Sequence, residues 1–345
     1  MDKHLLPFEK ITRKILIKKE AETDEKLGCK PENRATEEII HYGIVNINKP
    51  QGPTSHQVSD YVQKILNIKK SGHSGTLDPN VHGVLPIALD KATRIVQALL
   101  TSGKEYVGIM HLHKDVDETK INETIKKYFL GKIKQIPPLK SAVKRQERTR
   151  DIYYFEILEK DGQDVLFLVG CQAGTYIRKL IHDLGQKLTT GAHMLELRRT
   201  KAGPFDENTL FTLQDLTDAH YFYKNESNDK FLRKIIQPVE NAVAHLPKIW
   251  VFDTTVDSLC HGAALNVPGI SKLNDAIEVN DVVAIMTLKE ELIALGIAKL
   301  SSEEIIRLER GFAAKTESVF MQRGLYKPKI PPQNGGNFVV QRLPT

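Results

Sequence analysis

The feature that most constrains the fold is a glycine-rich segment, residues 72–79, followed at once by the apolar residues 81–86. Its glycines allow backbone conformations that other residues avoid, and an Asp-Pro pair favours the start of a turn. The segment predicts a packed turn rather than a helix or a strand, with one carboxylate, Asp78, on that turn. Asp78 is either the acid of an active site or a residue that only accepts a backbone N–H in an Asx-turn.

Length and charge limit the class of protein. The chain has 345 residues, 41% of them hydrophobic, which is enough for two globular domains with short appendages. The net charge of +6 favours a polyanionic partner. Residues 132–150 hold one acid, Glu147, among many bases, a density that suits phosphate contacts but also occurs on solvated faces. These bases are Lys132, Lys134, Lys140, Lys144, Arg145, Arg148 and Arg150.

The three cysteines are far apart, which disfavours both a disulfide framework and a zinc knuckle. No set of His and Cys residues has the spacing of a zinc motif, so we expect no metal. The first residues lack a signal pattern, and no apolar run approaches the roughly 20 residues that span a bilayer. We therefore expect a soluble protein of the reducing cytoplasm with no membrane partner.

Composition divides the chain into four parts. Residues 1–42 are charged and weakly periodic, and they predict an arm that packs on the C-terminal domain without forming a core. A main domain over residues 43–248 and a smaller domain over residues 249–326 follow. The tail, residues 327–345, is rich in Pro and Gly and is predicted to be mobile.

Periodicity predicts the elements of both domains. For the main domain they are a half-buried strand (44–48), a helix capped by Thr54 and Ser55 (to residue 66), a hairpin (153–158 and 165–171), a helix (176–184) and a largely helical linker (to residue 246). For the second domain they are three strands (263–267, 281–286 and 292–299) and a helix that starts at a capping box (301–304) and ends at Gly311. Short strands with one helix indicate a small barrel.

The wording of the glycine-rich segment, Gly-His-Ser-Gly-Thr-Leu-Asp-Pro, resembles the catalytic motif of the TruB and dyskerin family of RNA pseudouridine synthases. Residues 48–55, 103–107, 174–178 and 195–200 resemble further family motifs in the same order. The resemblance implies an α+β catalytic domain, built on a mixed, largely antiparallel sheet flanked by helices. It also implies that a small β-barrel of the PUA type follows this domain.

The resemblance assigns roles to four residues of the active site. Asp78 becomes the acid that attacks the target nucleoside, and Arg178 pairs with it. Tyr106 stacks on the flipped base, and Leu197 packs on the pocket. Taken singly, these residues would be an Asx-turn acid, a solvated cation and two core side chains. The implied reaction detaches a uracil, rotates it and rejoins it through carbon 5 with no cofactor, and whether Asp78 attacks the base or the sugar stays open.

The resemblance also implies contacts with RNA. His73 contacts the RNA as the uridine is flipped, and Lys49 belongs to the motif that supports the active-site loop and counts among the RNA-binding residues. Residues 137–145 resemble a family segment that precedes an RNA-clamping loop, and the C-terminal domain resembles a PUA domain that binds guide RNA. The expected RNA-binding residues are therefore His73, Lys49, Lys140, Lys144, Arg145, Arg148, His261 and Arg323.

The N-terminal arm, the wording of residues 52–56 and the PUA-type domain resemble archaeal members of the guide-dependent dyskerin branch. This resemblance implies an H/ACA guide RNA, a ribosomal RNA substrate and three small accessory proteins as partners. Guide-independent action on a tRNA T-loop uridine is the alternative within the family. A noncatalytic RNA-binding scaffold is the alternative from another class.

Overall fold

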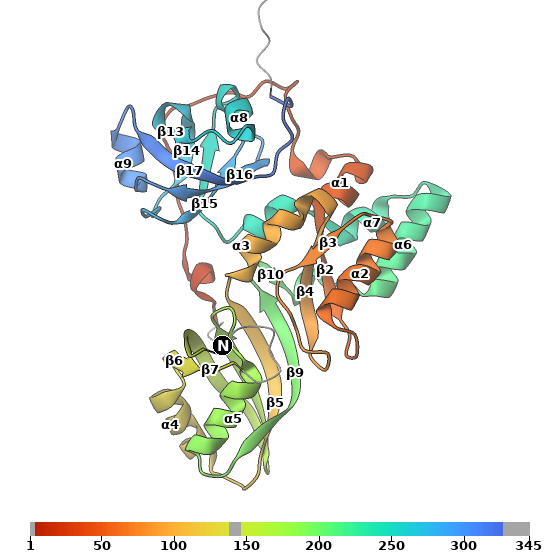
Figure 1. Cartoon of the computed structure of the whole chain (residues 1–345), viewed down its shortest axis with the longest axis vertical. Helices are drawn as coiled ribbons and strands as arrows, with labels where there is room; N and C mark the ends of the chain where they lie inside the picture. Colours follow the sequence, from red (N-terminus) through yellow and green to blue (C-terminus); the bar gives the residue numbers. More distant parts are fainter. Residues whose placement is uncertain (1–3, 138–145, 327–345) are drawn as a thin grey trace, which may run out of the picture.

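The computed structural model describes residues 4–137 and 146–326. A ten-stranded sheet runs through the main domain, and a separate seven-stranded sheet forms the C-terminal domain (Figure 1). The mobile tail predicted for residues 327–345, as well as Lys140, Lys144 and Arg145, fall outside the described residues. Within the described residues, no helix is long and apolar enough to cross a membrane.

The catalytic sheet is mixed and largely antiparallel, as predicted. Among the strand pairs described in this sheet, only β4 (His82–Leu89) and β9 (Ala192–Ala202) run parallel to each other. In this pair His82 faces Arg198 and Gly83 faces Arg199. The strand order is β11 (Ile236–Pro238), β2 (Gly43–Lys49), β4 (His82–Leu89), β9 (Ala192–Ala202), β5 (Lys104–Leu112), β8 (Asp164–Cys171), β7 (Arg148–Asp161) and β6 (Gly131–Gln135), with β10 (Phe205–Asp206) on β9 and β3 (Ser71–His73) on β4.

Helices cover this sheet at its two ends (Figure 1). At the β2 end lie α2 (Ser55–Leu66), α6 (Leu213–Glu226), α7 (Lys230–Ile235) and the short α3 (Val96–Leu100). At the other end lie α4 (Glu118–Tyr128) and α5 (Ile177–Lys187). The predicted cap of α2 is present, because the Thr54 side chain accepts a hydrogen bond from the backbone N–H of Gln57 at 3.2 Å. The amphipathic pattern predicted after Tyr176 gives α5, which buries Leu180, Ile181 and Leu184.

Several predicted boundaries differ from the structure; for example, the strand predicted over residues 153–158 is the longer β7. The segment predicted as a pure turn contains the short strand β3, and β4 begins at His82, because the apolar residues after the turn pair with β2 on one side and β3 on the other. The helix predicted to reach Gly311 is α9 (Ser302–Arg307), which ends four residues earlier. The strand predicted over residues 263–267 is reduced to β13 (Leu265–Asn266).

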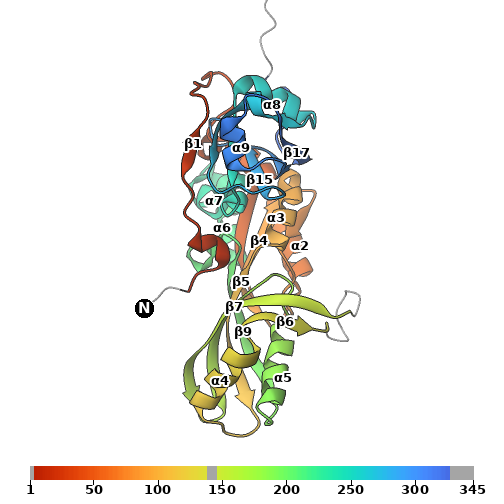
Figure 2. The same cartoon turned by 90° about the vertical axis from the view of Figure 1, so that its left-hand side faces the viewer.

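The C-terminal sheet takes its first strand from the N-terminal arm. Its order is β1 (Ile15–Ile17), β14 (Ile270–Asn274), β12 (Lys248–Val251), β15 (Val282–Met286), β16 (Leu292–Ala298), β17 (Phe312–Val319) and β13, with α8 (Asp253–Cys260) beside it. β1 pairs antiparallel with β14. Figure 2 shows the arm (red) running along one side of this domain.

The end of the arm departs from the prediction that the arm contributes no core. Residues 36–42 form helix α1 (Thr36–Tyr42), which buries Ile39 and Ile40 against strands β2 and β4. Because charged residues surround these two apolar residues in the sequence, the sequence pattern did not predict their burial. The arm therefore packs on both domains.

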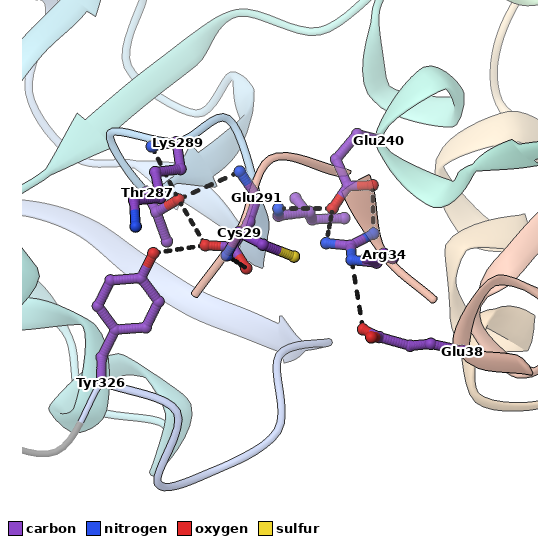
Figure 3. A network of polar contacts seen from close by, with 9 residues as sticks. Cys29, Arg34, Glu38, Glu240, Thr287, Lys289, Glu291 and Tyr326 are labelled. Carbon is purple, nitrogen blue, oxygen red and sulfur yellow. Dashed lines mark hydrogen bonds and ion pairs between the residues drawn. The ribbon is translucent and has the colours of Figure 1, made fainter. Parts of the chain in front are cut away.

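A network of buried polar contacts joins the arm to both domains (Figure 3). The Glu240 carboxylate accepts two hydrogen bonds from the Arg34 guanidinium, each at 2.8 Å, and one from the backbone N–H of Leu292 at 2.9 Å. Burial opposes the charge on Arg34, but the contact with Glu240 outweighs it and raises the pKa of Arg34. Beside this pair, the Glu291 carboxylate accepts hydrogen bonds from the Tyr326 hydroxyl and the backbone N–H of Cys29. The two carboxylates thus hold the arm, the catalytic domain and the C-terminal domain together.

Candidate active site

The loop that carries Asp78, residues 74–81, leaves β3 and returns to the sheet at β4; we call it the catalytic loop. Leu77 is buried, and its backbone N–H donates to the Ser55 hydroxyl at 2.8 Å. The Val81 N–H donates to the Asp78 carbonyl oxygen at 3.0 Å, which closes the turn. These bonds fix the backbone on both sides of Asp78, while its side chain stays 47% exposed and open to a substrate.

The catalytic loop is also held from inside by Lys49, at the end of β2. The ammonium group donates to the backbone carbonyl oxygens of Pro50, Pro79 and Val81 at 2.8, 3.0 and 2.8 Å. Lys49 has no exposed surface, and burial lowers its pKa. All three protons are used, so this side chain cannot reach a phosphate. The structure gives Lys49 the supporting role and corrects its assignment as an RNA-binding residue.

Asp78 and Arg178 meet in the structure. The distance between Arg178 Nη2 and Asp78 Oδ2 is 2.8 Å. Arg178 is the second residue of α5 and follows strand β8 closely in sequence, whereas the catalytic loop joins β3 to β4. The sheet therefore brings the two together across 100 residues of chain. An exposed ion pair contributes little to stability, so its main effect here is to orient the carboxylate.

Tyr106 and Leu197 lie on the neighbouring strands β5 and β9. Tyr106 on β5 faces Arg199 of β9, and Gly108 faces Leu197, so the tyrosine and the leucine share one face of the sheet. Gly108 leaves room for the Leu197 side chain, since a Cβ at position 108 would lie 2.8 Å from a methyl carbon of Leu197. Both side chains are less than 10% exposed and belong to one apolar cluster with Leu77, the neighbour of Asp78. Burial raises the pKa of Tyr106 and keeps its hydroxyl neutral.

Arg199 is a site residue that the sequence analysis did not single out. Its guanidinium is 1% exposed, donates from Nε to the carbonyl oxygen of Val84 at 2.7 Å, and lies 3.4 Å from that of Gly75 in the catalytic loop. Burial lowers the pKa of Arg199, an effect that the neighbouring Tyr106 hydroxyl partly offsets. Arg199 lies two residues after Leu197, and alternate residues of a strand share a face of the sheet. This spacing is the sequence signal that could have placed Arg199 beside Leu197 in the site.

His73 ends β3 at the entrance to the catalytic loop. Its Nε2 lies 3.3 Å from Nδ1 of His56 in the first turn of α2, and the two rings meet edge to face with centroids 4.6 Å apart. Burial and the nearby His56 and Arg199 lower the pKa of His73 to about 4. The ring of His73 is therefore neutral near neutral pH.

We expect the pKa of His73 to make the protein less stable as the pH falls. The folded protein keeps this ring neutral down to about pH 4, whereas the unfolded chain takes up a proton near the ordinary value of 6.5. The stability contributed by the neutral ring is complete above pH 6.5 and is lost progressively toward pH 4. Urea unfolding of His73→Gln should show a weaker decrease between these pH values than the wild type, while the exposed control His182→Gln follows the wild type. Equal slopes for His73→Gln and the wild type would contradict the assignment.

The remaining predicted RNA-binding residues lie in two places. Arg148 begins β7 and is partly exposed, next to the undescribed residues that hold Lys140, Lys144 and Arg145. His261 follows α8, and its Nδ1 lies 2.8 Å from the carbonyl oxygen of Asp257. Arg323 Nε lies 3.4 Å from the carbonyl oxygen of Cys260. The structure thus places Arg323 beside the backbone of Cys260, the residue that precedes His261.

Known protein families match these structural parts one by one. Residues 63–177 match the TruB family pseudouridylate synthase N-terminal domain, and residues 178–244 match the tRNA pseudouridylate synthase B C-terminal domain. Residues 247–320 match the PUA domain, and residues 4–59 match the DKCLD domain.

Relatives match over nearly the whole chain. Proteins named probable tRNA pseudouridine synthase B from Pyrococcus horikoshii and Pyrococcus abyssi are 57% and 56% identical to it, over 95% of this chain and 98% of each relative. The structure is similar to that of a Cbf5-Nop10-Gar1 complex, with 56% identity, a TM-score of 0.89, and 94% and 98% of the two chains covered. It is also similar to an H/ACA RNP bound to a substrate RNA containing 2'-deoxyuridine, with 53% identity, a TM-score of 0.88 and coverage of 94% and 99%.

These matches define an enzyme that isomerises uridine in RNA. The chain belongs to the TruB family of pseudouridine synthases and carries a C-terminal PUA domain. The resemblance stated from the sequence motifs is confirmed.

Proposed function

We propose that this enzyme converts specific uridines of ribosomal RNA under the direction of an H/ACA guide RNA, with Asp78 as the nucleophile. The observation that carries the assignment of Asp78 is its ion pair with Arg178 at the edge of the apolar cluster that holds Tyr106 and Leu197. A flipped uracil would leave the stack, lie against Tyr106 and Leu197, and present its reacting atoms to Asp78.

The reaction needs an acid held in position and a dry pocket. The bond from N1 of uracil to C1' of the ribose breaks, the bond from C5 to C1' forms, C5 loses a proton and N1 gains one. The Asp78 carboxylate attacks either the base or the sugar and leaves again, so the atoms balance without a cofactor. Lys49 and Arg199 hold the catalytic loop while these bonds change, and the apolar side chains of Tyr106 and Leu197 would limit the access of water to the detached base.

Two observations support a reaction that is directed by a guide RNA. The solved structures that match the whole chain are titled as a Cbf5-Nop10-Gar1 complex and an H/ACA RNP with substrate RNA. His261 and Arg323 both lie on the PUA domain, where they suit the phosphates of a guide RNA. In this proposal the guide RNA and three small accessory proteins complete the enzyme. The names of the sequence relatives favour tRNA as a second substrate. In that alternative the enzyme acts on tRNA without a guide.

The test compares two RNA substrates in the presence and absence of a guide. The purified chain, with its accessory proteins, receives either a ribosomal RNA fragment paired to an H/ACA guide or a tRNA transcript alone, and pseudouridine is counted by nucleoside chromatography. We expect conversion of the ribosomal fragment only when the guide is present. Faster conversion of tRNA without a guide would favour the second substrate. Binding without conversion in all reactions would overturn the enzymatic role of this site.

A further inference from the structure

A β-bulge in strand β9 lies beside the strand that carries Tyr106. Along the pair of β5 and β9, Glu105 faces Lys201. The next residue of β5, Tyr106, faces Arg199, so Thr200 is the extra residue of the bulge. Bulges commonly occur next to active sites, where they change the direction in which a side chain points.

The bulge decides which side chains of β9 share a face of the sheet with Tyr106. Continuing the register that precedes the bulge would place Thr200 opposite Tyr106. Because side chains alternate between the two faces of a strand, Leu197 and Arg199 would then lie on the face away from Tyr106. The bulge brings both residues to the face of Tyr106, so the active-site face of the sheet depends on it.

The carboxylate of Glu105 accepts hydrogen bonds from two other strands. The Thr200 hydroxyl of β9 donates to Oε1 at 2.8 Å, and the Tyr154 hydroxyl of β7 donates to Oε2 at 2.5 Å. The ammonium group of Lys201 lies 3.6 Å from Oε2. We call these four residues the Glu105 cluster. The extra residue of the bulge is thus tied to β5 through its side chain.

Tyr154 reaches Glu105 across strand β8. Gly170 of β8 faces Glu105 on one neighbouring strand and Tyr154 on the other. A Cβ on Gly170 would collide with the ring of Tyr154, so the glycine leaves room for the ring to extend toward β5. Burial and the Glu105 carboxylate raise the pKa of Tyr154, and its hydroxyl therefore stays a donor at neutral pH.

The start of the N-terminal arm contacts the same cluster. Lys201 donates to both carboxylate oxygens of Glu9 at 3.0 Å, and Glu9 belongs to a short helical turn, Pro7–Lys10. The rings of His4 and Tyr154 have centroids 5.1 Å apart. With the arm in this position Glu105 is only 7% exposed, and hydrogen bonds are stronger in such surroundings than in water.

We propose that Glu105 is a positioning residue for the isomerisation, because the Glu105 cluster fixes the bulge that places Leu197 on the face of Tyr106. Glu105 is next to Tyr106 in the strand and points to the opposite face, so it does not touch the base. The inference rests on the proposed function, in which the flipped base lies against Tyr106 and Leu197. A displacement of about 1 Å in an active site can lower a rate by about 100-fold.

The test is single-turnover conversion of uridine by full-length variants with guide RNA and accessory proteins, below the melting temperature of each variant. Glu105→Ala removes both acceptor oxygens and should slow conversion about 10- to 100-fold. Glu105→Gln keeps one acceptor oxygen and should restore part of this loss. Tyr154→Phe and Thr200→Val each remove one hydroxyl and should slow conversion about three- to tenfold. The matched control is Tyr153→Phe, which removes the hydroxyl of the preceding tyrosine of β7 and should convert RNA at the wild-type rate.

A double-mutant comparison separates positioning from a general loss of stability. Leu197→Ala removes a wall of the proposed base pocket, so Glu105→Ala should cause a smaller loss of rate in that background than in the wild type. Rate losses of the two variants that multiply independently would overturn the proposal, and so would wild-type rates for Glu105→Ala and Tyr154→Phe. Wild-type conversion by Leu197→Ala would instead contradict the base pocket of the proposed function, and the positioning role with it.

Discussion

Replacing Asp78 by asparagine is expected to reduce pseudouridine formation by at least about 10⁴-fold, the scale on which enzymes respond to loss of a nucleophile. Asparagine keeps the size of the side chain but has no charge with which to attack. The fold should remain intact, because the Arg178 side chain is 56% exposed and stays solvated when its partner is neutral. Affinity for guide RNA should stay within about twofold, since the PUA domain is untouched.

The measurement is single-turnover conversion with saturating enzyme, together with RNA binding under the same conditions. Asp115→Asn is the matched control, because Asp115 is an exposed acid whose Oδ1 lies 2.6 Å from the ammonium of Lys160, and it lies outside the active site. This control should convert RNA at the wild-type rate. If Asp78→Asn retained activity within tenfold of the wild type, Asp78 would not be the nucleophile.

Replacing Lys49 by methionine is expected to lower the free energy of unfolding by about 1–3 kcal/mol, because the buried Val81 carbonyl oxygen loses the ammonium donor, and so do the partly buried carbonyl oxygens of Pro50 and Pro79. Two of these, on Pro79 and Val81, belong to the catalytic loop, so turnover should fall as well. The affinity of the folded protein for RNA should not change, since Lys49 has no exposed surface.

The contrast is with Lys132→Met, which removes an exposed lysine of the basic stretch on β6. This variant should bind RNA more weakly and with a smaller salt dependence, yet unfold at the wild-type denaturant concentration. Urea unfolding and RNA binding at two salt concentrations distinguish the two lysines. A Lys49→Met protein with wild-type stability and weakened RNA binding would instead support the RNA-binding role that the sequence predicted for Lys49.

Local sequence patterns predicted the helices and strands of this protein better than they predicted which of its side chains are buried. The capped helix α2 and the hairpin of β7 and β8 follow from short-range signals, namely a capping residue and a turn between alternating runs. The proximity of Asp78 and Arg178 followed only from the family resemblance, because the sheet that joins them pairs strands far apart in sequence.

Lys49 and Arg199 show why the rest escaped prediction. Both are charged residues on strands, and a charged residue in an isolated sequence is expected at the surface. Each is buried because distant backbone carbonyls converge on it, from the catalytic loop onto Lys49 and from Gly75 and Val84 onto Arg199. No local pattern reveals such a convergence.

The pairing of β1 with β14 has a consequence for how the protein is made. Ile15 emerges from the ribosome early, but its partner Asn274 is synthesised roughly 260 residues later. At about 5–20 residues per second, the arm waits roughly ten seconds to a minute before its strand can pair. During that interval Leu16, which packs against the core of the C-terminal domain in the folded protein, lies in an unpaired segment, the type of exposed edge that invites aggregation. Newly made chains should therefore be most vulnerable before the last domain is complete.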